Sequence, residues 1–241
     1  MGRFARVVAV GCPHHVTQRG NFRRDIFFDD LDRQPYLDLL ADSAKEARLR
    51  IWGYCLMSKH VHWIVVPERP HAMARTFRVA HSNYSRWLNI RLRRGGHVWQ
   101  NQFFSCPLDP AHLAYGMRYV ESNPVRAEMV ESVLDYPWSS ARAHAGLEAA
   151  PDCLGANDWA ARYPADKWRQ VLGLGFRLSG DLDRLREATR TGRPFGAPDF
   201  VAELETKLNR ALLPQKRGPK PKQAPLHGSA AAQSGSGEIV R

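Results

Sequence analysis

The sequence has few cysteines and no long hydrophobic run, and both absences narrow the classes of protein that it can encode. Its 241 residues include only four cysteines, Cys12, Cys55, Cys106 and Cys153. No two of them have the short spacing of a metal-binding knuckle, so we expect reduced thiols in a cytoplasmic protein. The longest apolar run near the N-terminus, residues 7–10, is too short for the core of a signal peptide or for a membrane span.

Acidic residues are also scarce, and one long stretch has none. The chain carries 35 basic and 24 acidic residues, a net charge of +11. Residues 69–108 contain no Asp or Glu, but they hold aromatic residues and seven arginines: Arg69, Arg75, Arg78, Arg86, Arg91, Arg93 and Arg94. A solvated helix face normally mixes both charges, whereas arginines interleaved with aromatics suit a groove that binds phosphates and stacks unpaired bases. This stretch favours a nucleic-acid partner, although core aromatics beside surface arginines would give the same pattern.

The pattern of hydrophobic residues predicts an α+β domain. Strands are expected at 14–18, 51–57, 61–66 and 98–108, and helices at about 30–48, 71–94 and 109–123. Residues 58–59 are a short enough link for a hairpin, and Pro124 is expected to end the third helix because the residue before proline avoids the helical region. This order predicts a mainly antiparallel sheet with helices packed on one face, close to the ferredoxin-like pattern.

The composition shifts after about residue 146. Short helical patterns at 158–171, 181–190 and 199–212 predict a small helical C-terminal appendage, for which a helix-turn-helix is one weak alternative. From Pro214 onward the chain is rich in Lys, Pro, Gly, Ser and Gln, which predicts a disordered basic tail. The expected domains are therefore 1–145, 146–213 and 214–241.

Two short patterns could carry chemistry. His60 and His62 lie two residues apart in a predicted strand, so their imidazoles point to one face and could hold one divalent metal ion. Two ordinary hydrogen-bonding histidines would look the same. A hydrolase of the histidine-triad kind would need a further histidine at position 64, where the chain has Ile64.

The second pattern lies on the predicted helix that begins near residue 109. Tyr119 and Asn123 are four residues apart and therefore share a helix face, so a phenol nucleophile and a third metal ligand could lie together. Tyr115 lies one turn earlier on nearly the same face, and either tyrosine could simply pack in the core. A metal, a third ligand and a phenol are the parts needed to cut a phosphodiester.

Five segments resemble, in this order, the REP-associated tyrosine transposases, a branch of the HUH-type single-tyrosine transposases with an insertion-sequence-200-like domain. They are HVTQRGN at 15–21, YCLMSKHVH at 54–62, GHVWQ at 96–100, YVESNPVRA at 119–127 and YPWSS at 136–140. The resemblance covers roughly residues 1–145. Gln102 and Phe104 stand where basic residues are usual in the family, and Ser58 and Lys59 stand where Pro and Asn are usual.

The resemblance implies a ferredoxin-like HUH domain with His60 and His62 as ligands of Mg²⁺ or Mn²⁺, Asn123 at the position of the third ligand, and Tyr119 as the nucleophile. Such an enzyme would cleave and rejoin single-stranded DNA at hairpin (REP-type) sequences through a 5′-phosphotyrosine intermediate. We expect a monomer or homodimer associated with the nucleoid, without a small-molecule cofactor. The expected DNA contacts are Arg19, Arg75, Arg78, Arg86, Arg91, Arg93, Arg94 and Trp99, with Lys216, Arg217 and Lys220 in the tail.

Two alternatives stay open at this point. A domesticated DNA-binding regulator would bind the same hairpins without needing Tyr119. A metal-dependent phosphoesterase acting on small nucleotides would turn over without a covalent DNA adduct and would not need the arginine-rich stretch.

Overall fold

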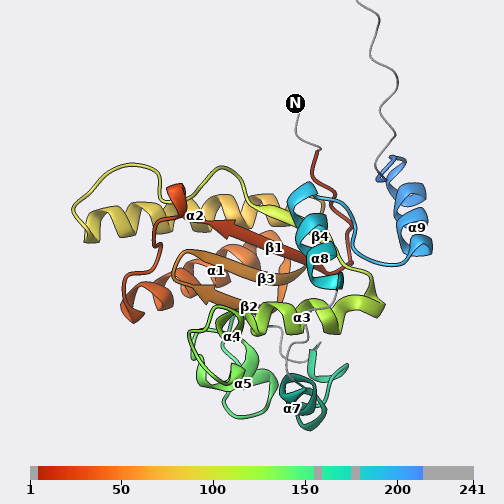
Figure 1. The fold of residues 1–241 in the computed structure, drawn as a ribbon. Coiled ribbons are helices and arrows are strands. Elements are labelled where there is room, and N and C mark those ends of the chain that lie inside the picture. The colour runs from red at the N-terminus through yellow and green to blue at the C-terminus, as the bar shows by residue number, and fades with distance from the viewer. Residues whose placement is uncertain (1–4, 155–158, 175–179, 214–241) are drawn as a thin grey trace, which may run out of the picture.

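The fold is built on a four-stranded antiparallel sheet with helices on both faces (Figure 1). It is seen in a computed structural model that describes residues 5–154, 159–174 and 180–213. The strands are β1 (His14–Arg19), β2 (Leu49–Met57), β3 (His60–Pro67) and β4 (Phe104–Pro107), in the spatial order β2-β3-β1-β4. The helices are α1 (Arg33–Ala47), α2 (Ala72–Arg91), α3 (Leu113–Glu121), α4 (Asn123–Arg126), α5 (Ala141–His144), α7 (Ala165–Gly173), α8 (Gly180–Thr191) and α9 (Pro198–Leu208).

The two faces of the sheet bury different helices. Tyr36 of α1 and Phe77 of α2 pack with Trp63 and other strand residues in one core. On the opposite face, residues of α3 and α8, including Met117 and Leu185, join a second core with Ile64. The predicted α+β class is confirmed, as is the predicted order of the main strands and helices along the chain. The expectation of helices on one face is correct only for α1 and α2, because α3 and α8 cover the other face.

The histidine pair lies on the sheet face that carries α3 and α8. In the antiparallel register, His62 is opposite Thr17 and His60 is opposite Arg19. Directly opposed residues of an antiparallel pair project to the same side of the sheet. The turn at 58–59 joins β2 to β3, which confirms the predicted hairpin. These pairings fix the positions of both histidines on a rigid central strand.

Helix α3 lies close to β2 because Gly53 has no side chain. A Cβ atom at Gly53 would come within 2.2 Å of Sδ of Met117 on α3. The prediction that Pro124 ends this helix is wrong in detail. Helix α3 ends at Glu121, and Asn123 and Pro124 open the separate turn α4. Proline is tolerated in a first turn because its missing N–H has no partner there.

The predicted strand at 98–108 is much shorter, since β4 covers only Phe104–Pro107. Asn101 has a left-handed backbone (φ 53°), which breaks the extended chain. The side chain of Gln18 donates to the carbonyl oxygens of Gln100 and Asn101, at 3.0 and 3.2 Å. Before β4, strand pairing is reduced to an isolated antiparallel bridge between Gly20 and Trp99, followed by these side-chain contacts.

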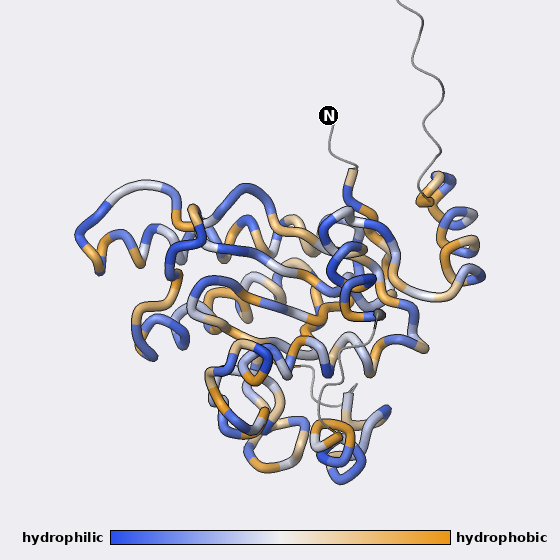
Figure 2. Tube along the Cα trace, viewed as in Figure 1, coloured by the Kyte–Doolittle hydropathy of each residue, from blue (hydrophilic) through white to orange (hydrophobic). Residues whose placement is uncertain are grey.

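The C-terminal helices α8 and α9 bury different surfaces of the N-terminal region. Leu185 of α8 packs in the core on the sheet, whereas Val201 of α9 packs against Val7 and Ala9. This separation does not favour a helix-turn-helix unit. Hydrophobic and hydrophilic stretches alternate along the helices in Figure 2, as expected of helices that bury one side.

Three further expectations concern cysteines, membrane spans and the tail. All four cysteines are free thiols, as predicted. No helix in the described ranges is long and apolar enough to cross a membrane. Lys216, Arg217 and Lys220 lie outside the described residues.

Candidate active site

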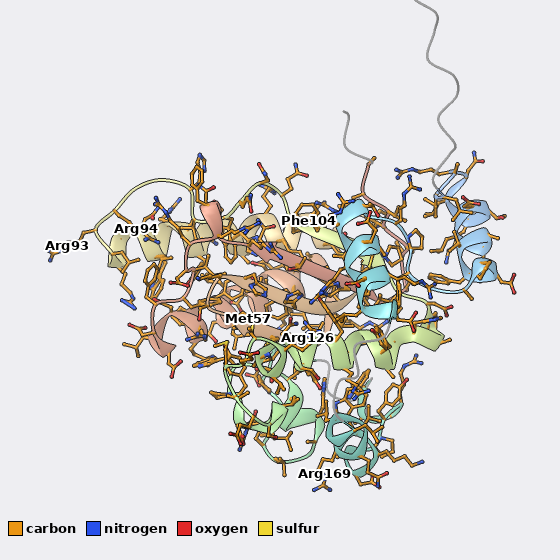
Figure 3. The ribbon with its side chains drawn as sticks, viewed as in Figure 1. Met57, Arg93, Arg94, Phe104, Arg126 and Arg169 are labelled. Atoms are coloured by element: carbon orange, nitrogen blue, oxygen red, sulfur yellow. The ribbon has the colours of Figure 1, made fainter. Side chains whose placement is uncertain are left out.

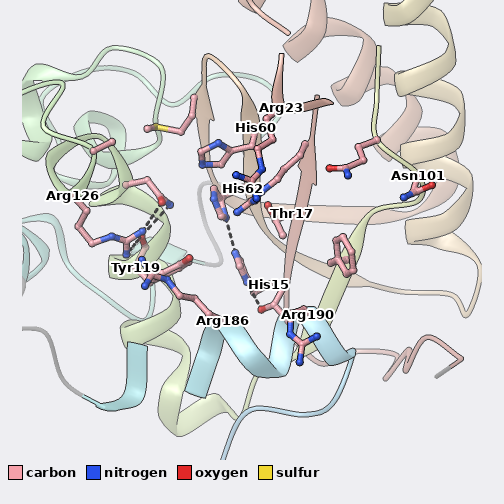
Figure 4. A pocket seen from close by; sticks show the side chains of 17 residues that line it. His15, Thr17, Arg23, His60, His62, Asn101, Tyr119, Arg126, Arg186 and Arg190 are labelled. Atoms are coloured by element: carbon pink, nitrogen blue, oxygen red, sulfur yellow. Dashed lines mark hydrogen bonds between the residues drawn. The ribbon is translucent and has the colours of Figure 1, made fainter. Parts of the chain in front are cut away.

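A basic pocket of about 700 Å³ opens on the sheet face between β1, β3, α3, α4 and α8 (Figure 4). It brings together His60, His62, Tyr119 and Asn123, the four residues predicted for metal binding and nucleophilic attack. None of its lining residues is acidic, and five are arginines: Arg19, Arg23, Arg126, Arg186 and Arg190. Such a site is suited to a polyanionic substrate.

The two histidines of β3 meet in this pocket as neutral imidazoles. Their ring centroids are 5.0 Å apart, with the rings nearly perpendicular. Burial, helped by Arg19 and Arg126, lowers the pKa of His60 to about 4. Burial and the neighbouring His60 and His15 hold the pKa of His62 well below its usual value. Neutral imidazole is the form that binds a metal ion.

His15 on β1 stacks against His62 and lies within hydrogen-bonding distance of it. Nε2 of His15 lies 2.9 Å from Nδ1 of His62, and the two ring planes differ by only 8°. Nδ1 of His15 lies 2.8 Å from Oγ1 of Thr189 on α8. Burial lowers the pKa of His15 to about 3, so this ring is neutral as well.

Tyr119 projects from α3 toward the histidines. Its ring centroid is 5.7 Å from that of His62 and 5.4 Å from that of His15, with both pairs edge to face. Tyr115 does not line the pocket and lies instead against Phe195, with ring centroids 6.1 Å apart. Helical spacing alone allows either tyrosine to face the histidines. The pocket contains Tyr119 and not Tyr115.

Arg126 of α4 links Tyr119 to Asn123. Its guanidinium carbon lies 4.0 Å from the centroid of the Tyr119 ring. Its Nη2 donates to Oδ1 of Asn123 at 2.5 Å, while Nδ2 of Asn123 donates to the carbonyl oxygens of Tyr119 and Val120. Burial lowers the pKa of Arg126, and the charge of Tyr119 acts in the opposite direction. The amide oxygen predicted to bind a metal is thus already held by a cation.

The residues of the pocket fit a divalent metal with some ligands left to substrate and water. Among the described residues there is no group of three or more His, Cys, Asp or Glu side chains that could hold an ion. His60 and His62 offer two neutral nitrogens on one face, and Asn123 could add an oxygen once Arg126 releases it. Mg²⁺ and Mn²⁺ commonly keep waters and substrate oxygens, so a small protein ligand set is compatible with them.

The predicted DNA-contacting arginines are spread over the molecule. Arg19 lines the pocket, whereas Arg78 and Trp99 line a second pocket of about 520 Å³. Figure 3 shows Arg93 and Arg94 at one end of the molecule, far from Arg126.

Two other arginines of that group have acidic partners. Arg75 lies 3.7 Å from Glu46, and Arg91 pairs with Asp29 and Asp32 at 2.5 and 2.8 Å. Arg86 is exposed and lines neither pocket. None of the seven arginines of residues 69–108 lines the first pocket, to which this stretch contributes Gln100, Asn101 and Phe104.

No local sequence pattern gave a role to Arg126, Arg186, Arg190 or Thr189, all of which line the pocket. Arg126 lies beyond the end of α3, so its position beside Tyr119 depends on the turn into α4. Arg186 and Arg190 have the same-face spacing of i and i+4 on α8. Their approach to the sheet depends on how α8 packs, which no local pattern shows.

Comparisons with known proteins show similarity to transposases. Residues 9–123 match the family described as Transposase IS200 like. A solved structure of the REP-associated tyrosine transposase bound to a REP hairpin is similar, with a TM-score of 0.54 and 17% identity over 64% of this chain and 92% of that one. A putative transposase from Deinococcus radiodurans R1 gives a TM-score of 0.36 and 16% identity, over 50% of this chain and 97% of that one. The comparison with curated proteins gives no match.

The antiparallel sheet carries a histidine pair on its central strand, and a tyrosine projects toward this pair from the facing helix. These features define an α+β domain with a basic, histidine-containing pocket. More particularly, residues 9–123, which include the sheet and α3, are similar to the IS200-like transposases.

Proposed function

We propose that this protein is a metal-assisted tyrosine transposase that cleaves and rejoins single-stranded DNA at hairpins. The observation that carries the proposal is that Tyr119 faces His60 and His62 across one pocket lined by arginines and without acids. The structural similarity to a transposase bound to a REP hairpin supports hairpin DNA as the substrate class.

Tyr119 is the proposed nucleophile. Its phenolate oxygen forms a bond to the scissile phosphorus, and the bond from phosphorus to the 3′ oxygen breaks. The leaving strand keeps the electron pair and takes a proton from solvent, which gives a free 3′ hydroxyl and a 5′-phosphotyrosine. The phosphotyrosine is still an ester, so attack by another 3′ hydroxyl rejoins the strand without ATP.

The surrounding residues prepare this step. Arg126 lies against the Tyr119 ring, where its positive charge can stabilise the negative charge that develops during attack. His60 and His62, with Asn123, are the proposed holders of Mg²⁺ or Mn²⁺. When bound, the ion would neutralise charge on a non-bridging phosphate oxygen. Arg19, Arg186 and Arg190 line the same pocket, where they can bind the flanking phosphates.

The test is covalent capture of hairpin-bearing single-stranded DNA in the presence of Mg²⁺. The wild-type protein and the Tyr115→Phe control should form a protein–DNA adduct, and Tyr119→Phe should form none. A combined His60→Ala and His62→Ala variant should bind the hairpin and fail to cleave it. An adduct formed by Tyr119→Phe would disprove the assignment of the nucleophile.

The same assay separates the two alternatives. Hairpin binding by the wild-type protein without any adduct would indicate a regulator that has lost strand transfer. Turnover of small nucleotide esters without an adduct would indicate a phosphoesterase.

A further inference from the structure

The hydroxyl group of Thr189 on α8 is joined to the proposed metal site through His15. Thr189, His15 and His62 are all buried. Oγ1 of Thr189 is 2.8 Å from Nδ1 of His15, and Nε2 of His15 is 2.9 Å from Nδ1 of His62 (Figure 4). Within the described residues, no hydrogen bond reaches Nε2 of His62. These two hydrogen bonds therefore connect Thr189 on α8 to His62, whose Nε2 is available to a ligand.

A further contact of Thr189 sets the direction of these hydrogen bonds. Oγ1 of Thr189 also donates to the carbonyl oxygen of Leu185 at 2.8 Å. A carbonyl oxygen can only accept, and a hydroxyl has one proton, so Oγ1 must accept the proton of Nδ1 of His15. The neutral ring of His15 then has no proton on Nε2. It must accept there from Nδ1 of His62.

His62 accordingly carries its single proton on Nδ1, and Nε2 holds a lone pair. We propose that Thr189 is a positioning residue that, through His15, fixes His62 in the tautomer able to bind a metal ion. This inference rests on the proposed metal-binding role of His62. If Thr189 instead donated to His15, the proton of His62 would lie on Nε2 and the ligand atom would be lost. The hydrogen bond of one ring nitrogen commonly decides which nitrogen of a histidine is metallated.

The direct test is the tautomer of His62 in the full-length, metal-free protein, read by ¹⁵N NMR with the signals assigned from a His62→Asn variant. Wild type and Thr189→Ser should show protonated Nδ1 and unprotonated Nε2. Thr189→Val keeps the shape of the side chain without the hydroxyl, and it should populate both tautomers. A proton on Nε2 in the wild type, or an unchanged tautomer in Thr189→Val, would overturn the inference.

Thr191→Val is the matched control. Thr191 also donates within α8, to the carbonyl oxygen of Glu187 at 2.8 Å, but it does not line the pocket. Its replacement should leave the His62 tautomer unchanged. Mn²⁺ titration without DNA, followed by electron paramagnetic resonance, gives a second readout. Thr189→Val should bind Mn²⁺ roughly 10–100-fold more weakly, whereas Thr189→Ser and Thr191→Val should bind like wild type. Equal affinity in Thr189→Val would contradict the proposed role.

If the proposed function were wrong, these experiments would give a different pattern of results from the one expected if only the inference about Thr189 were wrong. A wild-type protein that binds no Mn²⁺, or forms no adduct at Tyr119, overturns the metal-assisted nuclease. The tautomer of His62 in the metal-free protein would still report whether Thr189 and His15 control it.

Discussion

The guanidinium carbon of Arg126 lies 4.0 Å from the centroid of the Tyr119 ring. The same guanidinium donates to Oδ1 of Asn123, so a single cation contacts both the proposed nucleophile and a proposed metal ligand. Arg126 can therefore stabilise negative charge that develops during the proposed attack, and it would compete with the proposed metal ion for the amide oxygen of Asn123.

Replacing Arg126 should slow covalent adduct formation more than it weakens DNA binding. We expect Arg126→Gln to lower the rate by about 10²-fold, because a positive charge beside the reacting oxygen is lost. Single-turnover cleavage tests this, with Arg169→Gln on α7, exposed and outside the pocket, as the control. An unchanged rate would remove Arg126 from the mechanism.

Replacing the two arginines that follow α2 should weaken DNA binding without changing the cleavage of bound DNA. The double change of Arg93→Gln and Arg94→Gln removes two exposed cations that lie far from the pocket. If both contact phosphates, the slope of log affinity against log salt should fall by about 2. The adduct yield per bound hairpin should stay the same. A normal salt dependence in the double variant would exclude these arginines from the DNA interface.

The buried carboxylate of Glu121 should be important for stability. It accepts from Oγ of Ser140 at 2.6 Å, from Nδ1 of His144 at 2.6 Å and from Nε1 of Trp168 at 2.8 Å, which ties α3 to α5 and α7. Glu121→Gln removes one acceptor and the charge, so the free energy of unfolding should fall by about 2–4 kcal/mol. Urea denaturation measures the change.

The matched control for Glu121 is Glu148→Gln. Glu148 pairs with Arg142 in a partly exposed bridge. Its replacement should cost less than about 1 kcal/mol. Equal losses for the two variants would contradict the proposed importance of the buried group.

Stability should fall in mild acid because buried histidines must stay neutral. Burial lowers the pKa of His81 to about 3, and Nε2 of His81 lies 3.0 Å from the hydroxyl of Tyr36. In the unfolded chain, His81 takes up a proton near pH 6.5, whereas in the folded chain it does so only near pH 3. The stability that the neutral His81 contributes is therefore complete above pH 6.5 and is lost as the pH falls toward 3. The slope is about 1.4 kcal/mol per pH unit for each such proton.

His81→Gln tests this effect, because glutamine keeps a polar partner for Tyr36 and does not titrate. Its free energy of unfolding should depend less steeply on pH between about 6.5 and 4 than that of the wild type. His97→Gln is the control, since His97 is exposed. Parallel pH profiles for wild type and His81→Gln would show that His81 is not the responsible group.

Most of the fold could be predicted from local patterns, and the misses have identifiable causes. The β2–β3 hairpin follows from two β-rich runs and a two-residue link. Helix α2 follows from periodic apolar residues, although it ends at Arg91 rather than near 94. The strand expected at 98–108 is interrupted at Asn101, whose backbone is left-handed, and Gln18, far away in the sequence, binds the carbonyl groups of Gln100 and Asn101. A local pattern carries no information about such a partner.

The sequence by itself determined that His60 and His62 share a face of one strand, because strand side chains alternate with a period of two. Spacing left Tyr119 and Tyr115 open, and the family resemblance favoured Tyr119. The tertiary structure shows that Tyr119 faces the histidines, which depends on how α3 docks over Gly53, and that Asn123 belongs to the separate turn α4. It alone brought Arg126, Arg186, Arg190 and Thr189 to the pocket. Packing between segments far apart in the chain depends on the shape of both surfaces, and no short stretch of sequence encodes that shape.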